Sequence, residues 1–455
     1  MTDHYHGYIG LAAELLRSKG ITPGSRVRVK LSDGMEVTGV LMPRYEAERR
    51  PIIVVKLPNG YNIGIRADRV REIEGLGLLE KGAPGAPVPL LEEEPQPPEA
   101  KVAILGTGGT IASRVDYETG AVKPSLSQEE LVLAVPEILE YAMIDAEEIY
   151  AVLSEDMKPG MWARLVEEVA RRIESGYDGV VIAHGTDTMG YTAAALSFAF
   201  HRGLPVPVAL VGAQRSSDRP SSDAAFNLLS AVIVASRAPF AEVTVVMHGE
   251  TGDTYALAHR GTRVRKMHTS RRDAFQSINA LPLAKVWPSD GRIEVLDPNH
   301  RRRGEQELVV DNGFDDKVAL IKHFPGDIAT VIDALVDKGY HGIVIEGTGF
   351  GHIASDAIPS IERAVEEEVP VVIASQTIFG RVNLYVYSNG RRMLQAGVIP
   401  VEDMLAETAY VKLSWVLHRT RDMDEVRRLM TTSLAGEISG RHHLRLYPRW
   451  YHERL

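Results

Sequence analysis

The chain has 455 residues, a formal net charge of −10 at pH 7 and 44% hydrophobic residues, which is typical of a globular protein built from two or three domains. The negative charge excludes a nucleic-acid-binding surface over the whole chain, although it is compatible with a local basic patch. The sequence contains no cysteine, which excludes disulfide bonds, cysteine-based metal sites and a thiolate nucleophile.

The sequence shows no sign of membrane association. No apolar run reaches the length of a transmembrane helix. The segment Met1-Thr2-Asp3-His4-Tyr5-His6 lacks the basic-then-apolar pattern of a signal peptide. We therefore expect a cytoplasmic protein without membrane contact. We also expect that this chain holds neither a metal ion nor a cofactor of its own.

Residues 1–75 are expected to form a short amphipathic helix followed by a small β-barrel of the SH3-like kind. The helix is placed within residues 1–20, and short alternating strands follow from Gly24 onward. Asp33-Gly34 and Asn59-Gly60 are typical of tight hairpins. The basic residues of this region either follow phosphates or form a solubilising exposed face. They are Arg26, Arg28, Lys30, Arg44, Arg49, Arg50 and Lys56.

Residues 76–99 are rich in proline and glutamate and are expected to form an extended linker. From residue 100 to 305, strand-like and helix-like segments alternate, which predicts a doubly wound parallel sheet. The alternation resumes after a looser stretch at 281–316, so residues 306–435 are expected to form a smaller α/β domain. Residues 436–455 are assigned to a C-terminal tail.

These two regions contain clear strand and helix patterns. Strands are expected at 102–106, 180–183, 206–212, 243–247, 318–322, 342–346 and 371–375. Helices are expected near 128–141, 160–175, 191–203, 222–236, 327–338, 355–367 and 400–417.

A glycine-rich turn, Gly106-Thr107-Gly108-Gly109-Thr110, follows the first of these strands. Such a turn is first of all a candidate for binding a phosphate or a dinucleotide. Here the third glycine of a dinucleotide motif would fall on Ile111, and no Lys-Ser or Lys-Thr pair follows as in a P-loop. Taken alone, the segment fits a structural turn and a functional site equally well.

A second turn, His184-Gly185-Thr186-Asp187-Thr188, follows the strand at 180–183. Thr186 or Asp187 is compatible with an ordinary helix N-cap, but that interpretation explains only one of the two. Ligands of open α/β sheets bind just beyond the carboxyl ends of the strands. Hydroxyl groups on both turns, one with an adjacent carboxylate, therefore predict nucleophilic chemistry in a shared crevice.

A third segment, residues 261–275, is basic and contains Lys266. A solvated basic loop is the simple interpretation of such a run. The alternative is that Lys266 is a base that activates a threonine, oriented by a carboxylate such as Asp187. In that case the backbone N–H groups of the glycine turns would form the oxyanion hole.

The strings TGGTIA (107–112) and HGTDTM (184–189), with the 260–275 segment that ends in KMHTSRRDAF, together resemble the type I asparaginase family. The resemblance spans roughly residues 100–435. It implies that Thr110 is the nucleophile, and that Thr186 and Asp187 bind the substrate and act with Lys266.

The same resemblance implies further site residues. Ser154-Glu155-Asp156-Met157 matches the Ser-x-Asp-Met string of the family, so Ser154 and Asp156 are expected to bind substrate, together with Gly109. Tyr117 matches the tyrosine that the family places on a mobile loop to activate the nucleophile. The family also implies a homodimer, in which the second domain of the neighbouring protomer helps to close the site.

A barrel and a proline-rich linker ahead of an asparaginase-like core resemble the D subunits of archaeal glutamyl-tRNA(Gln) amidotransferases. Residues 375–384 and 396–400 are also similar to that branch. The resemblance implies a glutaminase that releases ammonia from glutamine. A partner protein, the amidotransferase E subunit, would use it to amidate glutamate carried on tRNA(Gln), with ATP and Mg²⁺ bound at the partner.

Two other interpretations remain open at this point. One is a free-standing L-asparaginase or glutaminase that carries an accessory barrel. The other is a non-enzymatic protein whose barrel binds RNA. The absence of cysteine fits a threonine amidohydrolase, because the common ammonia-supplying glutaminases use a thiolate.

Overall fold

The computed structural model describes residues 4–42, 51–56, 62–78, 98–108, 113–115, 122–124, 135–215, 222–441 and 446–447. The chain divides into two compact units. The first comprises residues 1–96, 110–125 and 215–224, and the second comprises 97–109, 126–214 and 225–455. Within the described ranges, no helix is long and apolar enough to cross a bilayer.

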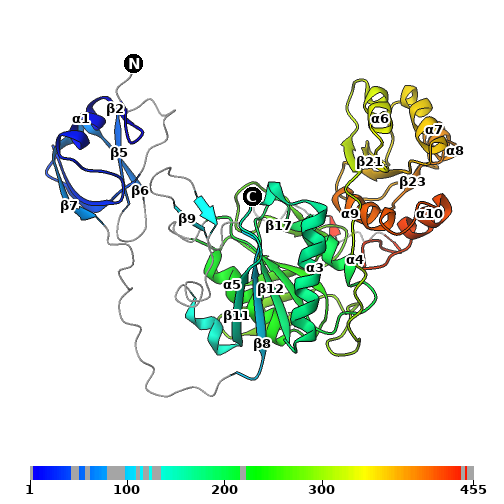
Figure 1. The fold of residues 1–455 in the computed structure, drawn as a ribbon, viewed down its shortest axis with the longest axis horizontal. Coiled ribbons are helices and arrows are strands. Elements are labelled where there is room, and N and C mark those ends of the chain that lie inside the picture. The colour runs from blue at the N-terminus through cyan, green and yellow to red at the C-terminus, as the bar shows by residue number, and fades with distance from the viewer. Residues whose placement is uncertain are drawn as a thin grey trace. The chain divides into compact units, whose positions relative to one another are not determined.

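The first unit contains a five-stranded antiparallel sheet with the strand order β6-β5-β4-β3-β7 (Figure 1). Its strands are β3 (Ser25–Leu31), β4 (Glu36–Leu41), β5 (Ile52–Lys56), β6 (Asn62–Arg66) and β7 (Val70–Leu78). Two short strands, β1 (His4–Tyr5) and β2 (Tyr8–Ile9), precede helix α1 (Gly10–Ser18), and a 3-10 turn, η1 (Ala67–Arg69), precedes β7. A separate pair, β9 (Ser113–Val115) and β10 (Val122–Pro124), is also antiparallel.

The core of this sheet follows from the alternation of its sequence. Val27 and Val29 of β3 are fully buried and pack in one cluster with Leu16 of α1. The predicted helix is confirmed; its buried side consists of Ala12, Ala13 and Leu16, whereas Leu11 is exposed. Among the described residues, no strand pairing joins β6 to β7, so closure into a barrel stays a prediction.

Two basic residues of β3, Arg28 and Lys30, form ion pairs with glutamates of the neighbouring strands. Arg28 lies 3.0 Å from Glu36 and 3.3 Å from Glu74, and Lys30 lies 3.0 Å from Glu72. These carboxylates offset the positive charge that would attract phosphates, which favours the interpretation as a solubilising face. Arg44, Arg49 and Arg50 lie outside the described residues.

The second unit contains an eight-stranded sheet with the order β11-β8-β12-β13-β14-β15-β18-β19. Its strands are β8 (Lys101–Gly106), β11 (Met143–Glu148), β12 (Gly179–Ala183), β13 (Val208–Val211), β14 (Val243–His248), β15 (Ala256–Arg260), β18 (Ala284–Trp287) and β19 (Arg292–Val295). The strands from β11 to β14 are parallel, which confirms the predicted parallel sheet. An antiparallel extension follows from β15 to β19. The sequence pattern missed β11 and β19 because their charged residues leave no apolar run.

Helices cover both faces of this sheet (Figure 1). Helices α3 (Pro159–Glu174) and α4 (Met189–Ala199) pack in one cluster with β12. Helix α5 (Ala224–Arg237) lies against the opposite face, where a Cβ on Gly179 would be 2.2 Å from the carbonyl oxygen of Ala235. Part of the helix expected at 128–141 lies outside the described residues, and its end is a 3-10 turn, η3 (Pro136–Glu140).

A second, four-stranded parallel sheet has the order β20-β21-β22-β23. Its strands are β20 (Val318–Lys322), β21 (Gly342–Gly347), β22 (Val371–Ser375) and β23 (Ile399–Pro400). Its helices are α6 (Ile328–Asp337), η5 (Ser355–Ala357), α7 (Ile358–Glu366), α8 (Ser388–Gln395), α9 (Ala406–Leu417) and α10 (Met423–Thr431). Phe198 of α4 and Trp415 of α9 share one buried cluster, which joins the two sheets. The predicted smaller α/β domain is thus confirmed, although α9 begins later than expected, after β23.

Candidate active site

The first threonine turn begins at the end of β8. Both the backbone N–H and the hydroxyl of Thr107 donate to the carbonyl of Ala183, at 2.9 and 3.0 Å, so this buried threonine has a structural role. Gly108 has a φ of +101°, and a Cβ there would lie 2.2 Å from the carbonyl oxygen of Val152. Gly109, Thr110 and Tyr117 lie outside the described residues, so their roles stay predictions.

The second turn connects β12 to helix α4 and carries Thr186 and Asp187. Thr186 is buried, whereas the side chain of Asp187 is 67% exposed. The helix begins at Met189 with Thr188 as its N-cap, and no side chain caps it. Neither Thr186 nor Asp187 is therefore a helix cap, and both side chains are available for other contacts.

Lys266 lies on β16 (Val264–Lys266), which pairs with β17 (Phe275–Ser277) in a short antiparallel hairpin. Its Nζ donates to Thr186 Oγ1 at 2.8 Å and to Asp187 Oδ1 at 2.9 Å. The lysine side chain is only 13% exposed, so it does not belong to a solvated basic loop. The structure thus brings together Thr186, Asp187 and Lys266, as expected from the sequence.

Ser154 lies beside the second turn, in the 3-10 turn η4 (Ser154–Asp156). Its Oγ is 3.5 Å from Asp187 Oδ2, and its carbonyl accepts a hydrogen bond of 2.6 Å from the Thr188 hydroxyl. A Cβ on Gly185 would lie 2.7 Å from the Cβ of Ser154, so only glycine permits this approach. Asp156 is exposed, and among the described residues no hydrogen bond joins its carboxylate to the others.

His184, whose role the sequence did not reveal, contacts the backbone of the second turn and helix α4, and so helps to hold the turn in place. Its Nδ1 lies 2.6 Å from the Gly185 carbonyl oxygen, and its Nε2 lies 2.9 Å from the Thr192 Oγ1. Burial lowers the pKa of His184 to about 4, so the imidazole is neutral at pH 7. A neutral ring with Nδ1–H donating to Gly185 and Nε2 accepting from Thr192 satisfies both contacts. The only sequence signal was its place directly before Gly185.

The cluster presents a hydroxyl, a carboxylate and an amine at the carboxyl edge of a parallel sheet. A hydroxyl has one proton to donate, so Thr186, which accepts from Lys266, keeps that proton for a further partner. The arrangement is suited to holding a polar substrate and to moving protons near it. In the part of the chain that the structure describes, no group of three or more histidine, aspartate or glutamate side chains is arranged to hold a metal ion.

Comparison with known proteins agrees with this fold. Residues 101–301 match the family model described as "Asparaginase, N-terminal", and residues 317–430 match the "Glutaminase/Asparaginase C-terminal domain". Residues 21–76 match the "GatD N-terminal domain". The L-asparaginase from Thermococcus kodakarensis superposes with a TM-score of 0.67 at 35% identity, covering 75% of this chain and 100% of the other. Fold and site together define an enzyme of the asparaginase class.

Relatives that match nearly the full length narrow this class. The D subunit of the glutamyl-tRNA(Gln) amidotransferase of Aeropyrum pernix is 63% identical, over 92% of this chain and 99% of its own. Its counterpart from Pyrococcus abyssi is 58% identical over 94% of this chain and 97% of its own. That from Sulfolobus acidocaldarius is 48% identical over 98% of each. The chain belongs to the family of glutamyl-tRNA(Gln) amidotransferase D subunits.

Proposed function

We propose that this chain is the glutaminase component of a tRNA-dependent amidotransferase, releasing ammonia from glutamine for the conversion of Glu-tRNA(Gln) to Gln-tRNA(Gln). The observation that carries the proposal is the contact of Lys266 Nζ with both Thr186 Oγ1 and Asp187 Oδ1. This contact joins two sequence motifs that lie 79 residues or more apart in the chain. The reaction proposed for this cluster is inferred from the family to which the chain belongs.

In the proposed reaction, Thr110 Oγ attacks the side-chain amide carbon of glutamine. The carbon–nitrogen bond then breaks, and the hydroxyl proton of Thr110 leaves with the amine as ammonia. Water hydrolyses the remaining γ-glutamyl ester and restores the hydroxyl. Thr186, Asp187 and Ser154 orient the substrate, and Gly109 and Asp156 contribute to its binding.

Two groups are proposed for the removal of the Thr110 proton, namely Tyr117 and Lys266. Two variants distinguish them, because Tyr117→Phe removes only the phenol hydroxyl and Lys266→Ala removes the side chain beyond Cβ together with its amine. If Tyr117 is the acceptor, the Phe variant loses the formation of the glutamyl ester. If Lys266 is the acceptor, the Phe variant retains ester formation and the Ala variant loses it.

The ammonia is proposed to pass to the amidotransferase E subunit, which binds ATP and Mg²⁺ and holds Glu-tRNA(Gln). We also propose that the reaction takes place in the cytoplasm. The relatives support this assignment over a free-standing asparaginase with an accessory domain, because they match the N-terminal region as well as the catalytic core. The matched L-asparaginase, by contrast, covers 75% of this chain.

A homodimer is also proposed, on the basis of exposed aromatic side chains near the carboxyl edge of the second sheet. Phe350 is 45%, Tyr385 69% and Tyr387 57% exposed, and the N–H of Asn383 donates to the Phe350 carbonyl at 3.0 Å. Exposed aromatic groups gathered in one place are typical of a protein–protein interface. A second copy of the chain is the proposed partner.

The assignment of the nucleophile is tested with two threonines of the same turn. Thr110→Ala is expected to abolish ammonia release from glutamine and leave the fold intact. Thr107→Val is the matched control, because its hydroxyl bonds to the Ala183 carbonyl within the fold, and it should keep kcat while losing some thermal stability. Ammonia release at saturating glutamine and thermal unfolding measure both. Normal turnover by a folded Thr110→Ala variant would overturn the assignment.

A further inference from the structure

Two residues that lead directly into β16, Thr262 and Arg263, are bonded to residues 435–439, far from them in the sequence. Thr262 is fully buried, and its hydroxyl donates to the carbonyl of Ala435 at 3.0 Å. Its own carbonyl accepts a bond of 3.0 Å from the hydroxyl of Thr408 on α9. The backbone directly before the Lys266 strand is thus held by two segments that lie far from it in the sequence.

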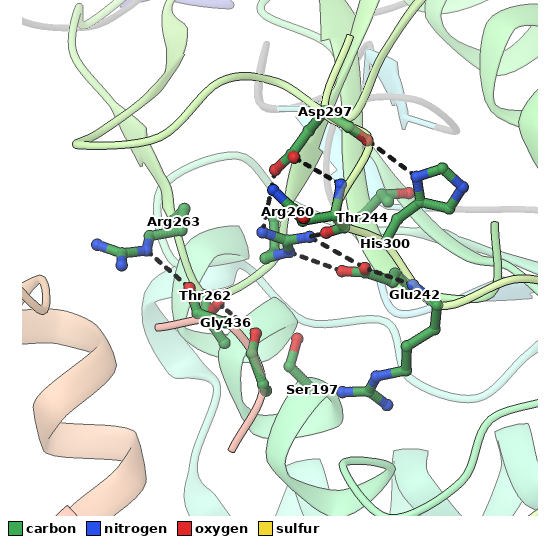
Figure 2. A network of polar contacts seen from close by, with 12 residues as sticks. Ser197, Glu242, Thr244, Arg260, Thr262, Arg263, Asp297, His300 and Gly436 are labelled. Atoms are coloured by element: carbon green, nitrogen blue, oxygen red, sulfur yellow. Dashed lines mark hydrogen bonds and ion pairs between the residues drawn. The ribbon is translucent and has the colours of Figure 1, made fainter. Parts of the chain in front are cut away.

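Arg263 is the main connection. Its side chain is 2% exposed, and its Nε donates to the carbonyl of Gly436 at 2.8 Å (Figure 2). Its Nη2 donates to Ser439 Oγ at 2.9 Å, and its Nη1 lies 3.2 Å from the carboxylate of the buried Asp403. A planar guanidinium that contacts acceptors on three sides holds its own backbone in a defined position.

The segment that Arg263 contacts is itself rigid. The backbone N–H and the hydroxyl of Ser439 both donate to the Asp403 carboxylate. Two residues earlier, Glu437 forms an ion pair of 2.6 Å with Lys412 of α9, and both side chains are fully buried. Residues 435–439 are therefore held against α9, and Arg263 bonds the start of β16 to them.

The other end of the same turn is fastened to the first sheet. Arg260, at the end of β15, donates to Glu242 at 2.7 Å and to Asp297 at 3.4 Å (Figure 2). The N–H of Arg263 donates to the carbonyl of Arg260 at 2.9 Å, which closes the turn. Arg260 thus fixes the exit from β15, and Arg263 fixes the entry into β16.

We infer that Arg263 is a positioning residue of the glutaminase site, which through Asp403, Gly436 and Ser439 sets the place of β16 and so of Lys266 Nζ. The inference rests on the proposed function. Arg263 touches neither Thr186 nor Asp187 in the described structure, and it acts through the strand. Among the described residues β16 pairs only with the short β17, so its position depends on this connection together with the packing of Val264. A displacement of about 1 Å at a reacting group can lower a rate by about 100-fold.

The test compares Arg263→Lys with a matched control, Arg419→Lys, in the full-length chain assayed alone and with its partner protein. Arg419 also donates to a carboxylate, that of Asp311, and to a backbone carbonyl, that of Gly313, but it lies just after the end of α9. Arg263→Lys is expected to lower kcat for glutamine by about 10- to 100-fold and to change KM by less than about threefold. Arg419→Lys is expected to lower the melting temperature to a similar extent and to leave kcat unchanged.

A milder variant keeps the test decisive if Arg263→Lys does not fold. Ser439→Ala removes one acceptor and leaves the ion pair of Arg263 with Asp403, and it should lower kcat by about three- to tenfold. A folded Ser439→Ala or Arg263→Lys with kcat within twofold of the parent would overturn the inference. Two further assays separate the two levels. Normal turnover by Lys266→Ala would remove the role of Lys266 in the reaction, whereas a parent chain that releases no ammonia from glutamine, alone or with its partner and tRNA, would show that the proposed function itself is wrong.

Discussion

Two lysine–carboxylate ion pairs lie at the carboxyl edges of the two sheets of the larger unit, and the distance between nitrogen and oxygen is the same in both. Lys266 is 2.9 Å from Asp187 at the first sheet, and Lys322 is 2.9 Å from Glu346 at the second. The two pairs differ in which side chain, the lysine or the carboxylate, is exposed to solvent. Lys266 is 13% and Asp187 67% exposed, whereas Lys322 is 58% and Glu346 11% exposed. At the first edge the amine is held inside, and at the second it extends into solvent.

The difference lies in what accompanies each pair. Lys266 also donates to the hydroxyl of Thr186, and Ser154 lies beside Asp187. Near the second edge the neighbouring side chains include the exposed aromatic residues Phe350 and Tyr385. An ion pair at a strand end is therefore not by itself an active site. The same architecture can support chemistry at one edge and association at the other, depending on the residues placed there.

The largest expected effect comes from removing each lysine in turn. Lys266→Ala should lower kcat/KM for ammonia release from glutamine by about 1,000-fold or more, because the amine contacts both Thr186 and Asp187. Lys322→Ala should change it by less than about threefold, because this amine is 58% exposed and, among the described residues, no contact joins it to Thr186 or Asp187. Equal losses in the two variants would remove the proposed distinction between the edges.

A smaller loss of glutaminase activity is expected when a charge is placed among the exposed aromatic residues at the second sheet. Tyr385→Asp places a carboxylate in the proposed interface between two copies, and it should shift the chain from dimer to monomer and lower glutaminase activity about tenfold. Met143→Asp, an exposed apolar residue on β11, is the control and should stay dimeric. Sedimentation and light scattering measure the mass. A Tyr385→Asp chain that stays fully dimeric would contradict the role given to this edge.

The smallest expected effect is on the pH dependence of the stability of the fold, through His184 beside the candidate site. The pKa of His184 is lowered by burial from 6.5 to about 4, so the unfolded chain binds more protons than the folded one between these values. Stability is therefore lost as the pH falls through this window, by about 2 kcal/mol between pH 7 and pH 5 for this residue alone. Thermal unfolding of the parent and of His184→Gln measures this. A parent no more sensitive to acid than the variant would refute it.

Much of this site was predictable because its residues follow strands. The apolar runs at 102–106 and 180–183 fix where two turns begin, and the parallel arrangement brings those turns to one edge. The contact of Lys266 with Asp187 was predicted from motifs and confirmed. The support of the turn by His184 and Thr192 was not predicted, because it depends on which face of α4 meets the turn.

The anchoring of Arg263 was also beyond the sequence. Its partners Asp403, Gly436 and Ser439 lie at least 140 residues away, and no periodicity relates them to β16. The antiparallel extension from β15 to β19 was missed for a related reason, since short strands of mixed polarity resemble loops. Local patterns identify elements and turns, whereas the packing of distant segments determines how firmly a catalytic strand is held.

The central claim is that this chain releases ammonia from glutamine for a tRNA-dependent amidation. The most direct measurement is ammonia release from glutamine and from asparagine by the purified chain, first alone and then with the amidotransferase E subunit and glutamylated tRNA(Gln). The account predicts glutamine turnover that is weak alone and rises sharply when the partner and tRNA are present. Fast asparagine turnover that is indifferent to both additions would contradict it.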